Sequence, residues 1–297
     1  MADDAKAVLG IVGGSGIYDL DGLANARRVA VATPFGAPSD ELVLGTLDGL
    51  DVAFLPRHGR GHRLSPSELN YRANVAALKT VGVTDLVSLS ACGSFREDLT
   101  PGTFVLVDQF IDRTFARAKS FFGDGLVAHV SMAHPVCRRL GDAVAAAAGG
   151  GIRCVRGGTY LAMEGPQFST LAESNLYRTW GCDVIGMTSM PEAKLAREAE
   201  ICYATVAMVT DYDCWHPLHD HVQVADIVRV LTANAEQGRG LVRRLAPSLE
   251  GRPTPCPQGC DRVLDSAIVT PRAAWDPAAV ERLACVAGRV LETARSP

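Results

Sequence analysis

Unbroken apolar runs alternate with segments of helical periodicity along most of the chain. Unbroken runs are typical of strands that are covered on both faces, whereas apolar residues spaced three and four apart indicate a helix with one buried face. The runs that read as strands occupy residues 7–14, 51–56, 84–91, 102–108, 182–187 and 201–210. This pattern predicts an α/β protein, a single domain with a central, mixed and largely buried β-sheet flanked by helices.

Capping residues mark two expected helix starts. The segment SPSE at 65–68 offers an N-cap serine, a proline at the first helical position and a glutamate that can close a capping box, and Gly82 lies past the expected end. The segment SMPE at 189–192 repeats the same spacing. Both segments therefore predict the start of a helix.

Helical spacing returns near the C-terminus. It predicts a long amphipathic helix over 224–245 and a final helix over 278–291, with a Pro-rich, linker-like stretch at 251–260 between them. We expect residues 1–250 to form the main domain and residues 251–297 to form a tail and helix that pack on it.

The composition of the chain indicates which kinds of molecule the protein can bind. The chain has 297 residues, of which 47% are hydrophobic and 21% are charged, with a formal net charge of −4. No basic field exists to hold nucleic acid, and no run approaches the roughly 20 apolar residues of a membrane span. The N-terminus carries acids where a signal peptide needs positive charge. We expect a cytoplasmic protein with a small-molecule substrate, and neither a nucleic-acid nor a membrane partner.

The nine cysteines do not suggest a secreted disulfide framework. Most stand singly in apolar segments, where we interpret them as small core residues: Cys92, Cys137, Cys154, Cys182 and Cys202. Cys256 and Cys260, in CPQGC, are the exception. A zinc site needs a second ligand pair, and only Cys285 follows, so a local thiol pair or a disulfide is favoured and no metal is expected.

Two acids, Asp211 and Asp213, end the apolar run 201–210. On a strand, positions two apart point to one face, so both side chains are expected to enter the same space. Burial and mutual repulsion raise the pKa of such a carboxyl and make it a proton donor near neutral pH. A metal is an alternative, since His216, His219 and His221 follow. A heterocycle such as adenine, with a ring nitrogen and an amino group, fits better.

Short polar segments follow three other strands. Gly13-Gly14-Ser15-Gly16 offers free amides and a hydroxyl to an anion, and Arg57 and His58 open a basic cluster. Ser90 adds a hydroxyl at the end of the run 84–91. Each segment alone is equally compatible with an ordinary turn or a basic surface loop.

Two further segments offer contacts for a nucleoside, MEGPQFST at 163–170 and DVIGMTSMPE at 183–192. Phe168 could stack on a flat ring, Met187 could lie under a sugar, and Thr188 supplies another hydroxyl. Either apolar residue is also compatible with a place in the core.

Taken together, these segments resemble the purine nucleoside phosphorylase family, and within it the branch that acts on S-methyl-5′-thioadenosine. The resemblance is carried by GIVGGSG, TPFGAPSD, RHGRGHRLSPSELNYRAN, SACGSFREDLTPG, VDQFIDRT, MEGPQFSTLAES, WGCDVIGMTSMPEAKLAREAEICYA and TDYDCW. It extends over most of the chain and is weakest from Gly251 onward. It implies the purine nucleoside phosphorylase-like fold and a phosphorolysis, with inorganic phosphate as co-substrate and no cofactor.

By motif position, the resemblance implies roles for individual residues. Asp211 corresponds to the acid that protonates purine N7, Asp213 helps to hold the 6-amino group, and Phe168 and Met187 line base and ribose. The phosphate ligands would be Ser15, Arg57, His58, Ser90, Ala91 (through its amide) and Thr188. The family usually has threonine where Ser15 and Ser90 stand, which keeps the hydroxyl.

The resemblance also implies how the rest of the nucleoside is held. Val224, Ile227 and Val228 correspond to the apolar surface for the methylthio group, and His129 to a residue contributed by a neighbouring subunit. A homotrimer with shared active sites would follow. The alternatives are a phosphorylase for methylthioinosine or other 6-oxopurine nucleosides on the same fold, and a non-catalytic nucleotide-binding protein.

Overall fold

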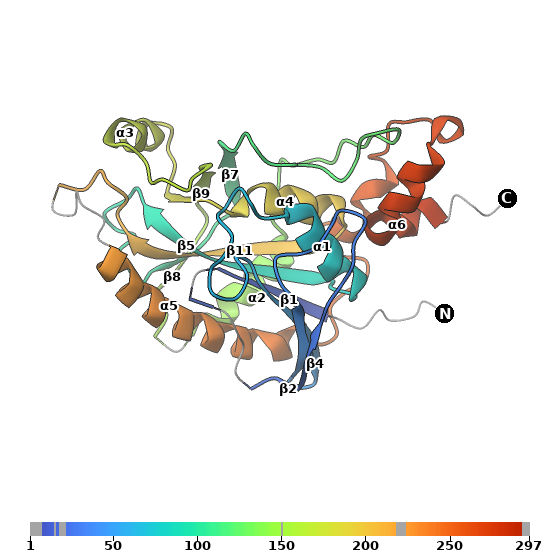
Figure 1. The fold of residues 1–297 in the computed structure, drawn as a ribbon. Helices are drawn as coiled ribbons and strands as arrows, with labels where there is room; N and C mark the ends of the chain where they lie inside the picture. The colour runs from blue at the N-terminus through green and yellow to red at the C-terminus, as the bar shows by residue number, and fades with distance from the viewer. Residues whose placement is uncertain (1–7, 15, 18–21, 150, 218–223, 293–297) are drawn as a thin grey trace.

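The computed structural model describes residues 8–14, 16–17, 22–149, 151–217 and 224–292, and within them the centre is a mixed sheet of 11 strands (Figure 1). The strands are β1 Val8–Gly13, β2 Ala24–Val29, β3 Leu42–Leu47, β4 Leu50–Pro56, β5 Asp85–Ser94, β6 Phe104–Leu106, β7 Gln109–Asp112, β8 Cys154–Arg156, β9 Thr159–Ala162, β10 Val184–Gly186 and β11 Cys202–Asp211. The runs read as strands in the sequence correspond to β1, β4, β5, β6, β10 and β11. The other five strands are short or partly exposed, so their apolar signal was too weak to read.

Four of the strands, β4, β1, β5 and β11, are parallel neighbours in that order. Gly13 pairs with Pro56 and with Leu89, and Leu89 pairs with Val206, so the ends of β1 and β4 are level with the middle of β5 and β11. The carboxyl ends of parallel strands in an α/β sheet are where ligands bind. The polar segments that follow these strands therefore meet at one edge.

Helices cover both faces of the sheet (Figure 1). One face carries α1 Tyr71–Thr80, α4 Ser189–Glu198 and α6 Pro277–Glu292, and the other carries α2 Arg138–Ala147 and α5 Val224–Leu245. Two separate hydrophobic clusters fill the spaces between the sheet and these helices. A smaller cluster contains Tyr177 of α3, Leu171–Thr179. The expected mixed sheet flanked by helices is confirmed.

Helix α1 begins later than the sequence pattern predicts. Ser65 and Glu68 form a separate turn, in which the Ser65 amide donates to the Glu68 carboxylate at 2.9 Å. The helix starts at Tyr71, because Asn70 accepts the Ala73 amide at 3.1 Å and so acts as the N-cap. The predicted start at residues 65–68 was wrong, whereas Gly82, with φ +88°, does follow the helix end.

The C-terminal segment packs on helices that cover the sheet rather than extending away from the domain. Helix α6 contacts α1, and the short 3₁₀ helix η2, Cys260–Asp265, contacts α4. The linker-like stretch 251–260 is anchored by Cys256 and Cys260, which are 3% and 1% exposed. Both are free cysteines, so the alternative of a disulfide between them was wrong.

None of the helices in the described part of the chain is both long enough and apolar enough to cross a bilayer.

Gly186 of β10 shows how tightly the sheet packs beside the ligand edge. A Cβ added there would lie 1.9 Å from the hydroxyl of Tyr160, whose side chain is fully buried. The Gly186→Ala variant should therefore lose about 3 kcal/mol of unfolding free energy, because the added methyl group would force the buried Tyr160 side chain from its packed position. Urea denaturation measures this loss.

Gly141→Ala in α2 is the matched control. Apart from Gly141 itself, its two chain neighbours and the nearby backbone of its own helix, no atom lies within 4 Å of a Cβ added there. Alanine in a helix interior should raise the unfolding free energy by about 0.5–1 kcal/mol. Equal stability of the two variants would contradict this account of packing around Tyr160.

Candidate active site

A cavity of about 550 Å³ lies at the edge where the parallel strands end. Ten residues singled out in the sequence line it: Gly14, Arg57, His58, Ser90, Ala91, Phe168, Met187, Thr188, Asp211 and Asp213. Six separate stretches of sequence thus meet in one concave space. That is the arrangement expected of a small-molecule site.

Arg57, at the end of β4, lies beneath the glycine turn and is 1% exposed. Its guanidinium donates to the Glu192 carboxylate at 3.0 Å, to the Ser88 hydroxyl at 2.6 Å and to the Leu89 carbonyl at 3.2 Å. A Cβ on Gly14 would approach Nη1 of Arg57 to 2.9 Å, so a side chain there would collide with the guanidinium. Glu192 compensates most of the charge that Arg57 brings to the cavity.

The role of Glu192 corrects the expected capping box at residues 189–192. Met190 has non-helical backbone angles inside α4, which breaks the regular first turn that a capping box needs. Thr188 precedes the helix, and its hydroxyl makes no capping bond. It lies instead 3.5 Å from the Ser90 hydroxyl, which leaves two buried hydroxyls side by side at the cavity wall.

His58 faces the cavity as a neutral ring. Its Nδ1 lies 2.8 Å from the Leu64 carbonyl, which can only accept, so Nδ1 carries the proton and Nε2 the lone pair. The ring stacks on His62 with centroids 4.2 Å apart. Burial and the adjacent Arg57 charge lower the pKa of His58 to about 4. The side chain is therefore uncharged at neutral pH.

The two acids lie at and just past the end of β11. Burial raises the pKa of Asp211 and that of Asp213. The Asp211 carboxylate accepts the Thr210 hydroxyl at 2.7 Å and the Asp213 amide at 2.8 Å. These two bonds fix its orientation against Gly93, where a Cβ would come within 2.9 Å of Oδ1 of Asp211. The expected raised proton affinity is present.

The sequence predicted that alternation along a strand would bring Asp211 and Asp213 to one face, and that explanation was wrong. Strand β11 ends at Asp211, after a register shift between Val209 and Asp211, and Asp213 lies in a turn with φ +53°. Alternation along a strand therefore does not bring the acids together. The turn does so, by folding the backbone at Asp213 back onto the carboxylate of Asp211.

The apolar wall is formed by Phe168, Met187 and residues that the sequence did not single out. Phe168 is 57% exposed, so it is not a core residue. Met163, Ile185 and Leu231 also line the cavity. Their apolar character alone could not distinguish them from the surrounding core.

Arg117 is another residue that the sequence did not reveal. It is buried beside the cavity and donates to the carbonyls of Glu164 and Met190, at 2.6 and 2.8 Å. It also donates to the carbonyl of Met187. It thus fastens the two segments that carry Phe168 and Met187. No motif surrounds this arginine in the sequence, which hid its role.

Some expected residues cannot be placed in the cavity. Ser15 lies outside the described residues. Val224, Ile227 and Val228 lie in the first turns of α5, but their side chains are also outside the described part. His129 is exposed and lines a different hollow, with Lys119 and Glu198. The chain's own cavity does not include it.

Sequence comparison places the chain among known enzymes. Residues 8–247 match the family model described as the phosphorylase superfamily. The chain is 65% identical over 287 residues to the S-methyl-5′-thioadenosine phosphorylase of Rhodospirillum rubrum, covering 96% of this chain and 98% of that protein. It is 64% identical over 287 residues to the enzyme of the same name from Bradyrhizobium diazoefficiens, covering 96% and 99%.

Solved structures agree with the sequences. A methylthioadenosine phosphorylase sourced from an antarctic soil metagenomic library superposes with a TM-score of 0.87 at 47% identity, covering 95% of this chain and 99% of that one. The Schistosoma mansoni enzyme in complex with adenine gives 0.81 at 35% identity, covering 88% and 99%. The chain therefore belongs to the phosphorylase superfamily, in the family of S-methyl-5′-thioadenosine phosphorylases.

Proposed function

We propose that this chain uses inorganic phosphate to cleave S-methyl-5′-thioadenosine into adenine and 5-methylthioribose 1-phosphate. The names of its relatives support the substrate. The observation that carries the chemistry is that Asp211, a carboxyl with a raised pKa, lines the same cavity as Arg57, Ser90 and Thr188. The proposed proton donor and the proposed anion ligands thus line one cavity, which supports a reaction that needs both.

The proposed reaction needs no covalent enzyme intermediate. A phosphate oxygen forms a bond to the ribose C1′ as the bond from C1′ to purine N9 breaks, and the electron pair moves onto the purine. Asp211 gives its proton to N7, so adenine leaves as a neutral molecule, and Asp211 then takes a proton from solvent. Asp213 accepts a hydrogen bond from the 6-amino group. Proton transfer of this kind contributes about 10²–10⁴-fold to the rate.

The phosphate would be held mainly by neutral donors, because Glu192 already compensates Arg57. These donors are the hydroxyls of Ser90 and Thr188, that of Ser15, and the amide of Ala91. Nε2 of neutral His58 would accept a hydrogen bond from a hydroxyl group of hydrogen phosphate or of the ribose. Such a site binds the anion in a dry cavity without leaving an unpaired cation when the anion departs.

The methylthio end of the substrate would lie against α5. Positions 224, 227, 228 and 231 are spaced so that they share one face of a helix, and Leu231 of this set lines the cavity. An apolar face suits a thioether, which makes poor hydrogen bonds. His129 would complete this end from a neighbouring subunit of a homotrimer. Its exposure, away from the cavity of its own chain, supports that assignment.

Phosphate dependence tests the reaction class. Methylthioadenosine, adenosine and methylthioinosine are each assayed spectrophotometrically with and without phosphate or arsenate. We expect base release from methylthioadenosine only when one of these anions is present. Cleavage in phosphate-free buffer would indicate a hydrolase, equal rates for methylthioinosine would contradict the role of Asp211, and binding without cleavage would indicate a non-catalytic protein.

Asp211→Asn should reduce kcat for methylthioadenosine by about a hundredfold or more, because an amide cannot give a proton to N7. In the parent enzyme kcat should fall as pH rises through the raised pKa of Asp211, since only the protonated form donates. Asp124→Asn, at a carboxyl that is 91% exposed, is the control and should retain parental kcat. A value for Asp211→Asn within a few-fold of the parent refutes the assignment.

His129→Ala should raise KM for methylthioadenosine and leave KM for phosphate unchanged, because His129 is assigned to the thioether end. His134→Ala, at another exposed histidine in the same loop, serves as the control. Light scattering on the parent should give a trimer. A monomer with full activity, or an equal rise in both KM values, would remove His129 from the site.

A further inference from the structure

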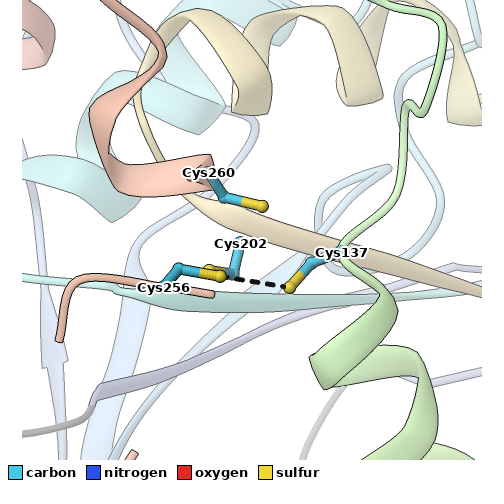
Figure 2. A group of neighbouring side chains, drawn as sticks. All are labelled: Cys137, Cys202, Cys256 and Cys260. Carbon is cyan, nitrogen blue, oxygen red and sulfur yellow. Dashed lines mark hydrogen bonds between the residues drawn. The ribbon is translucent and has the colours of Figure 1, made fainter. Parts of the chain in front are cut away.

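Four cysteine sulfurs meet at the opposite end of β11 from the two acids. The four-cysteine cluster consists of Cys137, Cys202, Cys256 and Cys260, and its sulfur atoms all lie within 4.8 Å of one another (Figure 2). Each residue is at most 3% exposed. The cluster combines two cysteines that looked like isolated core residues with the pair in CPQGC. The second ligand pair that the sequence seemed to lack comes from upstream segments.

The backbone holds each member in a defined place. Cys137 precedes α2, with its amide donating to the Tyr203 carbonyl at 2.8 Å, and Cys202 is the first residue of β11. Cys256 and Cys260 flank a turn whose last residue, Gly259, has φ +66°. The Asp261 carboxylate accepts the Cys256 amide at 3.0 Å. Three distant segments therefore present their sulfurs to one point, as the four side chains in Figure 2 show.

From this geometry we propose that the four-cysteine cluster binds one zinc ion as a tetrahedral thiolate site. A zinc–sulfur distance of about 2.3 Å requires sulfurs about 3.8 Å apart in a tetrahedron. The sulfurs of Cys137 and Cys256 are 3.7 Å apart. The spacing of three residues between Cys256 and Cys260 also falls within the two to four that zinc-binding cysteine pairs typically have.

The groups around the cluster suit anionic sulfur. Arg197 is 8% exposed and donates to the Cys260 sulfur at 3.6 Å, and among the described residues it forms no ion pair with a carboxylate. Arg252 donates to the Cys202 sulfur at 3.7 Å. A buried cation needs an anion beside it, and four thiolates around a doubly charged ion leave a net charge of −2. Arg197 offsets part of that charge, whereas Arg252 also pairs with Asp85 at 3.0 Å and with Asp261 at 3.6 Å.

Metal binding would release the thiol protons to solvent. A hollow lined by Cys137, Gln258 and Gly259 adjoins the cluster and provides a route of entry.

The zinc ion would fasten the C-terminal segment to the sheet. Strand β11 has ten residues from Cys202 to Asp211, so the cluster lies about 30 Å from the acids. All four positions are occupied by cysteine, which is typical of a structural site without an open position for substrate. The site therefore contributes to stability and is independent of the proposed phosphorolysis.

Metal analysis of the full chain tests the proposal. The protein is produced with zinc in the medium and purified without chelator, and metals are measured by mass spectrometry. We expect about one zinc per chain, lost in Cys256→Ser and in Cys260→Ser and retained in Cys285→Ser. Cys285 lies in α6 outside the cluster and is the matched control. Iron or no metal in the parent would overturn the assignment.

Two measurements on the parent chain do not depend on how the variants fold. Cobalt(II) added to metal-free, reduced protein should give the intense visible absorption of tetrahedral thiolate coordination. Thiol titration in denaturant with chelator and without reductant should find all nine cysteines reactive. Only five reactive thiols would mean that the cluster is oxidised to two disulfides, which excludes the metal site. Removal of zinc should lower Tm and leave activity at 25 °C unchanged.

Discussion

The buried ion pair between Arg57 and Glu192 holds the ligand edge of the sheet together. Arg57 directly follows β4, donates hydrogen bonds to Ser88 and Leu89 of β5, and pairs with Glu192 in α4. Glu192 also accepts the Tyr203 hydroxyl from β11 at 2.9 Å. Four elements thus meet at two side chains. Loss of either partner would leave an uncompensated buried charge, which typically costs about 3–5 kcal/mol.

This pair also sets the electrostatic character of the cavity. Because the arginine charge is compensated, the proposed phosphate end offers hydroxyls and a neutral histidine rather than a free cation. The opposite end offers two carboxyls whose pKa values are raised by burial. Strand β5 connects the two ends, with Ser90 and Gly93 about 10 Å apart along it. That separation is compatible with the proposed placement of a ribose between phosphate and purine.

The two ends of strand β11 belong to two different proposed sites. Its last residue is the proposed proton donor, and its first belongs to the four-cysteine cluster. Nearly every residue between them is buried, so the strand is held rigidly by the core on both faces. A fixed strand keeps the Asp211 carboxyl oriented. A zinc ion bound by the four-cysteine cluster at the other end of the strand would hold the C-terminal segment without altering the cavity.

The sequence by itself determined the α/β class, the main parallel strands, α5, α6 and most of the cavity-lining polar residues. It could do so because continuous apolar runs mark buried strands, and the polar residues directly follow them. Only the tertiary structure decided the start of α1, the turn that brings Asp213 to Asp211, the pairing of Arg57 with Glu192 and the meeting of Cys137 and Cys202 with Cys256 and Cys260. These features join residues through turn geometry or across long stretches of chain, and local periodicity carries no information about either.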